Sequence, residues 1–108
     1  MPVTMPLKIL LPAIVIGATA LALPARADEA LARRYNCVMC HELDKKFVGP
    51  GFQEVARRYE GQPDAAAMLY EKVRKGGAGS WGAVAMPPNR TVPAGDIRRL
   101  VDWVLKSG

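Results

Sequence analysis

Four stretches of the chain carry apolar residues at every third or fourth position, which is the spacing of an amphipathic helix. They cover residues 28–36, 52–59, 64–75 and 93–106, and connections rich in glycine and proline separate them. No run alternates apolar and polar residues as a half-buried strand would. The sequence therefore predicts an all-α fold of about four short helices. The side chains expected to pack inside it are Leu31, Tyr35, Phe52, Val55, Ala56, Tyr59, Leu69, Val73, Ile97, Leu100, Val101 and Val104, with Met68 and Trp103 as further core candidates.

Residues 1–27 follow a different pattern. Lys8 supplies a positive charge, residues 9–23 form an apolar run of roughly fifteen residues, and Ala25-Arg26-Ala27 matches an A-x-A cleavage site. This pattern predicts a signal peptide at 1–27, cleaved after Ala27, followed by one domain at 28–108. An uncleaved membrane anchor is the alternative, although the run is shorter than the about 20 residues that span a bilayer.

The predicted mature chain is small and mildly basic. Removing residues 1–27 from 108 leaves 81 residues and lowers the formal charge from +5 to +3, because Lys8 and Arg26 are lost. A core of this size seldom supplies more than about 3–5 kcal/mol, so natural domains add a disulfide, a metal or a cofactor. The basic residues are scattered and lack interleaved aromatic residues, which argues against a nucleic-acid partner. We expect a monomer without stable membrane association.

Both cysteines and the one histidine of the chain lie in Cys37-Val38-Met39-Cys40-His41. This is the C-x-x-C-H signature for attaching a c-type haem. Two thiols at this spacing can each add to a vinyl group on one edge of the porphyrin, and the next imidazole then lies under the iron. The motif predicts one covalent haem c, bound through Cys37 and Cys40, with His41 as an axial iron ligand. Haem attachment outside the bacterial cytoplasm agrees with export to the periplasm.

Other interpretations of the motif remain open. A dithiol–disulfide pair of the thioredoxin type normally sits between a strand and a helix, a context that this sequence does not show. Structural zinc needs four ligands, whereas Cys37, Cys40 and His41 offer three. A chance match is the remaining alternative.

The connection at residues 76–92 contains a second candidate ligand. Loops above about 12–15 residues are uncommon in compact domains and are usually functional. Met86 is followed by Pro87 and Pro88, which hold the backbone extended. Met86 could present its thioether to the iron or fill a gap in the core. An iron held by one histidine needs a sixth ligand, which favours the first interpretation.

Four segments resemble the short bacterial class I cytochromes c, which are periplasmic monohaem electron carriers. The segments are C-V-M-C-H, V-G-P-G-F-Q-E-V-A-R-R-Y, S-W-G-A-V-A-M-P-P-N and L-V-D-W-V-L-K, and the resemblance covers nearly all of residues 28–106 in order. It implies a class I cytochrome c fold, with helices around one haem. It also implies that His41 and Met86 ligate the iron from opposite faces, and that the Pro50 carbonyl accepts the other ring proton of His41.

The resemblance implies further roles around the cofactor. Asn89 would orient the methionine sulfur, Trp81 would donate its indole proton to a haem propionate, and Lys72 would lie near the same group. Relatives often have more prolines where this chain has Ala83 and Ala85, so we expect a less stiff loop.

The predicted function is one-electron transfer without catalysis. A histidine–methionine pair raises the reduction potential and leaves no iron position for a substrate. Weak encounters at an exposed haem edge would link a quinol-oxidising complex or another donor to a terminal oxidase or nitrite reductase. The rival interpretations are a haem enzyme or gas sensor with a labile or vacant sixth iron position, and a dithiol–disulfide oxidoreductase.

Overall fold

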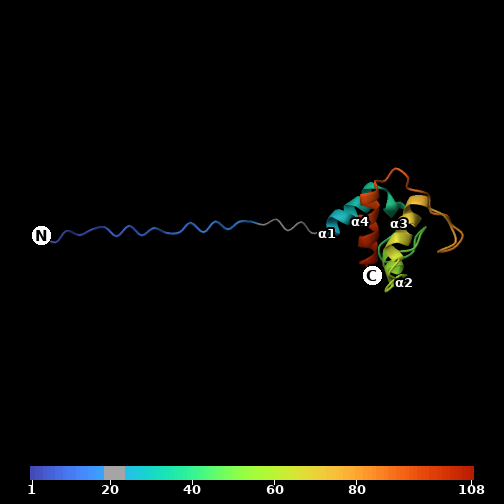
Figure 1. The fold of residues 1–108 in the computed structure, drawn as a ribbon, viewed down its shortest axis with the longest axis horizontal. Helices are drawn as coiled ribbons and strands as arrows, with labels where there is room; N and C mark the ends of the chain where they lie inside the picture. Colours follow the sequence, from blue (N-terminus) through green and yellow to red (C-terminus); the bar gives the residue numbers. More distant parts are fainter. Residues whose placement is uncertain (19–23) are drawn as a thin grey trace.

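The computed structural model of the protein describes residues 1–18 and 24–108 and contains four α-helices and one 3₁₀ turn (Figure 1). The elements are α1 (Pro24–Arg34), η1 (Cys37–Met39), α2 (Phe52–Arg58), α3 (Ala65–Lys75) and α4 (Ala94–Leu105). Within the described ranges there is no strand, and an isolated bridge joins Gly77 to Met86. The all-α prediction is confirmed.

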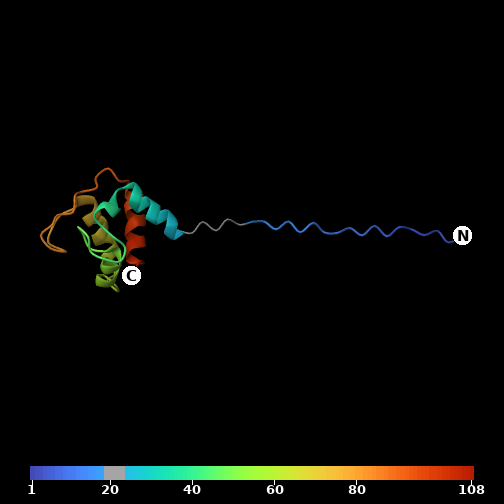
Figure 2. The ribbon, with the colours of Figure 1, turned by 180° about the vertical axis from the view of Figure 1, so that it is seen from behind.

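Residues 1–18 run as an extended chain away from the helices (Figures 1 and 2). Part of the predicted signal peptide, residues 19–23, lies outside the described residues. None of the helices in the described part of the chain has the length and apolar content needed to cross a membrane.

Helix α1 begins earlier and ends earlier than the predicted helix at 28–36. It begins at Pro24, a residue type that is tolerated in the first turn because its missing N–H needs no partner there. It ends at Arg34, and Asn36 then adopts a left-handed conformation with φ 62°. Asparagine tolerates this conformation better than most residues, so it can turn the chain directly into η1. The predicted cleavage point after Ala27 therefore lies inside α1.

The other three helices lie within about one residue of their predicted bounds. The start of α2 shows how a loop supports a helix. The first N–H groups of a helix have no partner within it. Here the N–H groups of Phe52 and Gln53 donate to the carbonyls of Glu42 and Leu43, at 2.8 and 2.9 Å. The loop after His41 is thereby tied to the first turn of α2.

Helix α4 is the centre of the fold and packs against α1, α2 and α3 (Figures 1 and 2). At its contact with α1, Leu31, Ala32 and Leu100 form a buried cluster, and Ala32 is completely inaccessible. The Tyr35 hydroxyl donates to Asp96 Oδ2 at 2.6 Å and so joins the same two helices. These contacts hold α1 and α4, which are far apart in the sequence, side by side.

Some side chains expected in the core are not buried there. Leu69, Val73 and Val104 are half-buried because they face a cavity instead of a neighbouring helix. Met68 is exposed, and its assignment to the core was wrong. Trp103 is half-buried and packs edge-on against Phe52, with ring centroids 5.3 Å apart.

Candidate cofactor site

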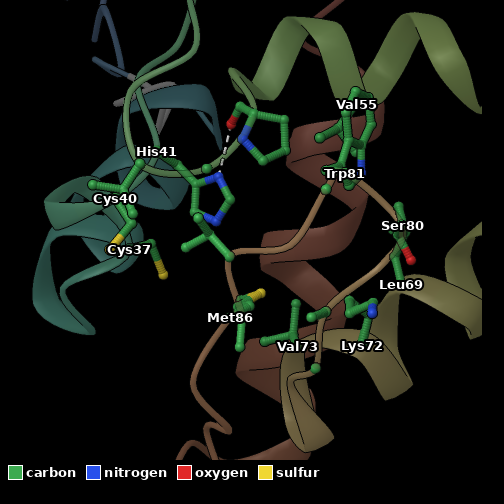
Figure 3. A pocket seen from close by; sticks show the side chains of 18 of the residues that line it. Cys37, Cys40, His41, Val55, Leu69, Lys72, Val73, Ser80, Trp81 and Met86 are labelled. Carbon is green, nitrogen blue, oxygen red and sulfur yellow. Dashed lines mark hydrogen bonds between the residues drawn. The ribbon is translucent and has the colours of Figure 1, made fainter.

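A cavity of about 520 Å³ lies between the helices and the two long connections (Figure 3). This volume falls within the range of pockets that bind cofactors. Its walls come from the turn after α1, the loop before α2, helices α2, α3 and α4, and the 76–92 segment. The residues of these walls that bear on its chemistry or its apolar character are Cys37, Cys40, His41, Phe47, Pro50, Phe52, Leu69, Lys72, Val73, Trp81, Met86 and Val104.

The segment from Cys37 to His41 is one helical turn. The Cys37 carbonyl accepts hydrogen bonds from the N–H groups of Cys40 and His41, at 3.2 and 3.0 Å. This turn places both thiols and the imidazole at the cavity (Figure 3). Neither cysteine is in a disulfide, and both are half-buried.

The His41 ring is held on three sides. Its Nδ1 lies 2.7 Å from the Pro50 carbonyl oxygen, which makes Nδ1 the protonated nitrogen and leaves the Nε2 lone pair free. Phe52 stacks on the ring with centroids 5.2 Å apart and planes inclined by 20°. Gly49 lies so close that a Cβ at this position would be 2.7 Å from His41 Cε1. The imidazole is therefore fixed before any ligand reaches it.

The thiol chemistry does not match a redox dithiol. Burial raises the pKa of the Cys37 thiol, and the neighbouring Cys40 thiol adds to this effect. Reactive disulfide-exchange cysteines instead have a lowered pKa, which keeps them as thiolates. In the described residues, no three His, Cys, Asp or Glu side chains are grouped so as to hold a metal ion such as zinc.

Met86 reaches the cavity from the 76–92 segment (Figure 3). Its N–H and carbonyl exchange two hydrogen bonds with Gly77, each 2.9 Å long. Gly76 ends α3 with φ 68°, and a Cβ there would overlap the Met86 carbonyl oxygen. The methionine backbone therefore lies against Gly76 at the end of α3 and is hydrogen-bonded twice to the next residue, Gly77.

Asn89 attaches the chain to α3 three residues after Met86. Its backbone N–H donates to the carbonyls of Val73 and Arg74, and its side-chain Nδ2 donates to Val73 O at 3.0 Å and Pro87 O at 3.3 Å. The last carbonyls of a helix lack partners within it, so Asn89 caps α3. The structure gives its amide these carbonyl partners, whereas the resemblance implied the sulfur of Met86.

Trp81 and Lys72 border the cavity from the 76–92 segment and from α3 (Figure 3). The Trp81 ring meets Tyr59 edge-on, with centroids 6.4 Å apart, and the Arg58 guanidinium lies 4.3 Å above it. Apolar spacing gave no sign of the part played by Arg58, because only tertiary packing brings the end of α2 to Trp81. The same spacing predicted Phe52 only as a core residue.

The residues around the cavity fit a covalently bound haem. Two thiols lie on one turn, and an imidazole nitrogen and a thioether sulfur reach the same space from two different segments. Nitrogen and sulfur donors of this kind are the axial pair found in cytochromes c. The walls between them are mostly apolar, as a porphyrin disc requires.

Comparisons with known proteins agree with this assignment. The sequence model of the cytochrome c family matches residues 27–108. The chain is 47% identical over 81 residues to cytochrome c-551 of Allochromatium vinosum, covering 75% of this chain and 86% of the relative. The crystal structure of Nitrosomonas europaea cytochrome c552 superposes with a TM-score of 0.72 at 39% identity, covering 74% of this chain and 99% of that one. The class 1 cytochrome MtoD of Sideroxydans lithotrophicus superposes with a TM-score of 0.68 at 34% identity, covering 80% and 98%.

Proposed function

The chain belongs to the cytochrome c family of electron-transport proteins with covalently bound haem c, and from this premise we propose that it is a one-electron carrier ligated by His41 and Met86. When bound, haem would supply one-electron chemistry, because its iron is stable in both the ferric and the ferrous state. The observation that carries the proposal is that both side chains border one cavity while their backbones are held by hydrogen bonds.

The turn from Cys37 to His41 would hold the haem. Cys37 and Cys40 lie three positions apart on one helical turn, which suits two thioether bonds on one porphyrin edge. His41 would coordinate through Nε2, because Nδ1 donates its proton to Pro50. The hydrogen bond from His41 Nδ1 to the Pro50 carbonyl fixes the tautomer of the imidazole and makes Nε2 a stronger ligand.

Met86 would occupy the remaining axial position. Its two hydrogen bonds to Gly77 and the Asn89 cap on α3 fix the backbone on both sides of the methionine. Asn89 would thereby support Met86 through the backbone. With both axial positions filled, no substrate could bind the iron, so the protein would transfer electrons without catalysis.

The apolar surroundings of the cavity would favour the reduced state of a bound haem. Ferric haem carries one more positive charge than ferrous haem, and an apolar environment penalises that charge. A penalty of about 2.3 kcal/mol on one charge corresponds to roughly 100 mV. Trp81 and Lys72 would place their N–H groups near the haem propionates and partly compensate the negative charge of these groups.

The rim of the cavity would be the contact surface for redox partners. Phe47, Val48 and Val84 line the cavity and are exposed by 59%, 45% and 70%, and Met39, in the neighbouring turn η1, is exposed by 67%. Exposed apolar patches of this kind often mark interaction sites. We propose brief encounters there with a quinol-oxidising complex or other donor and with a terminal oxidase or nitrite reductase as acceptor.

The proposed place of action is the periplasm. Residues 1–18 expose their apolar side chains, among them Ile14 and Ile16 at 81% and 85%. This property suits a leader that is removed during export, after Ala27. Mass spectrometry of the purified protein should give a chain that begins at Asp28 and carries one haem.

Absorption spectra of the purified protein test the ligation. The ferric protein should show the far-red sulfur-to-iron charge-transfer feature, and Met86→Ala should abolish it, whereas Met39→Ala should leave it unchanged. Prompt carbon monoxide binding by the ferrous wild type at neutral pH would instead identify an enzyme or gas sensor. Extraction of the colour by acidified acetone would contradict covalent attachment through Cys37 and Cys40.

A further inference from the structure

Arg58, the last residue of α2, reaches across to the 76–92 segment. Its Nη1 donates to the carbonyl oxygen of Ser80 at 2.5 Å. Its guanidinium carbon lies 4.3 Å from the centre of the Trp81 ring and 5.6 Å from that of Tyr59. One exposed side chain therefore contacts two consecutive residues of the loop and an aromatic ring of its own helix end.

The part of the loop around Trp81 has few other attachments. Among the described residues, the hydrogen bond from Arg58 to Ser80 is the only one that joins residues 78–85 to a helix. The other backbone bond of this stretch is internal, from Gly79 N–H to the Gly82 carbonyl at 2.8 Å. Gly79 and Gly82 both have positive φ. Because glycine has no Cβ, no side chain restricts the backbone at these two positions.

We infer that Arg58 is a positioning residue, which fixes the place and plane of Trp81 at the rim of the haem cavity. The hydrogen bond to Ser80 sets the distance between the loop and the end of α2. The guanidinium over the Trp81 ring sets the tilt of the indole plane. Arginine suits this task because its planar group can stack on a ring and donate along its edge at the same time. Trp81, which borders the cavity, is then held in place before the haem propionate is present.

The inference rests on the proposed function only in that Trp81 is taken to meet a haem propionate. The positioning itself depends on contacts between side chains of the protein. Tyr59 contributes to it, because its ring meets Trp81 edge-on with planes inclined by 77°. Trp81 is thus confined between a cation on its face and an aromatic ring at its edge.

Neighbouring residues offer matched controls. Arg57 carries the same charge one position earlier on α2 and is exposed, and no hydrogen bond or ring contact of its side chain occurs among the described residues. Trp103 is an internal control, because it packs on Phe52 away from Arg58. Arg58→Lys keeps the charge but loses the planar group.

Hydrogen exchange of the holoprotein tests the inference. Mass spectrometry resolved to single residues should show that the Gly79 amide, which donates the internal hydrogen bond of this stretch, exchanges about tenfold faster in Arg58→Met than in wild type, with Arg58→Lys intermediate and Arg57→Met unchanged. In nuclear magnetic resonance spectra of the ferrous protein, the Trp81 indole N–H should follow the same order while the Trp103 indole N–H stays constant.

Equal exchange rates in Arg58→Met and Arg57→Met, within twofold, would overturn the positioning role. The result is separable from the ligation proposal. Absence of the far-red absorption feature from the ferric wild type would contradict ligation by Met86. The mass-spectrometric comparison does not depend on that feature.

Discussion

A methyl group added at Gly49 should disturb the proximal histidine. Its carbon would lie 2.7 Å from His41 Cε1 and 3.0 Å from Nδ1, whereas ordinary contacts of this kind begin at 3.4 Å. Gly49 does not have a positive φ, so alanine would cause no backbone strain at this position. The Gly49→Ala variant therefore tests the contact with the ring alone.

The overlap can be relieved in two ways, and both weaken a hydrogen bond. If the ring moves, the 2.7 Å bond from His41 to Pro50 lengthens, and if residue 49 moves, its 2.8 Å bond to the Cys40 carbonyl lengthens. Overpacking costs about 1–3 kcal/mol, and a weakened hydrogen bond adds about 0.5–1.5 kcal/mol. We expect a loss of about 2 kcal/mol, which lowers the unfolding midpoint of such a domain by roughly 8–16 °C.

Thermal unfolding of the ferric holoprotein, followed by far-ultraviolet circular dichroism, measures this loss. Gly95→Ala is the matched control, because that glycine lies in α4 with no atom within 4 Å of an added Cβ. The control should be more stable than wild type by about 0.4–1 kcal/mol. If Gly49→Ala melted at the wild-type temperature and left the resonance of the His41 ring N–H unmoved, the added methyl group would not press on the ring.

Three further predictions concern the helix contacts and the cofactor. Tyr35→Phe should lower the unfolding midpoint at pH 7. Because the hydrogen bond to Asp96 raises the pKa of Tyr35, the loss of stability in Tyr35→Phe should be fully present below about pH 10. It should disappear as the pH rises through the pKa of Tyr35 in the folded protein, which melts at several pH values measure. Gly76→Ala should weaken the ferric far-red feature, since its Cβ would overlap the Met86 carbonyl, whereas Gly61→Ala, with a similar φ of 75° and free space around it, should leave the feature intact. The mature chain without haem should show no cooperative melt by circular dichroism, because side chains that line the cavity would lose their packing partner.

The helices could be predicted from the sequence because their signals are local. Apolar spacing marks the faces of α2, α3 and α4, and a glycine or proline stands within three residues of each of their ends. The start of α1 was harder to predict, because a proline and a cleavage-site pattern overlap there. The C-x-x-C-H motif likewise specifies its chemistry within five consecutive residues.

The walls of the cavity depend on contacts between distant segments, and periodicity does not reveal them. Leu69 and Val73 have the spacing of core residues, and the sequence cannot distinguish a face that packs on a helix from one that packs on a cofactor. The Asn89 cap on α3 joins residues 16 positions apart, and the Arg58 bond to Ser80 joins residues 22 positions apart. Such partners follow from the tertiary fold.

The contact between α1 and α4 has a consequence for the order of assembly. The buried surface around Ala32 is completed by Leu100, which belongs to α4. A chain that emerges with its N-terminus first therefore keeps α1 without this docking partner until α4 has been made. Until then Leu31 and Ala32 lack the apolar cover that Leu100 gives them, and so does Cys37, which packs against the same cluster.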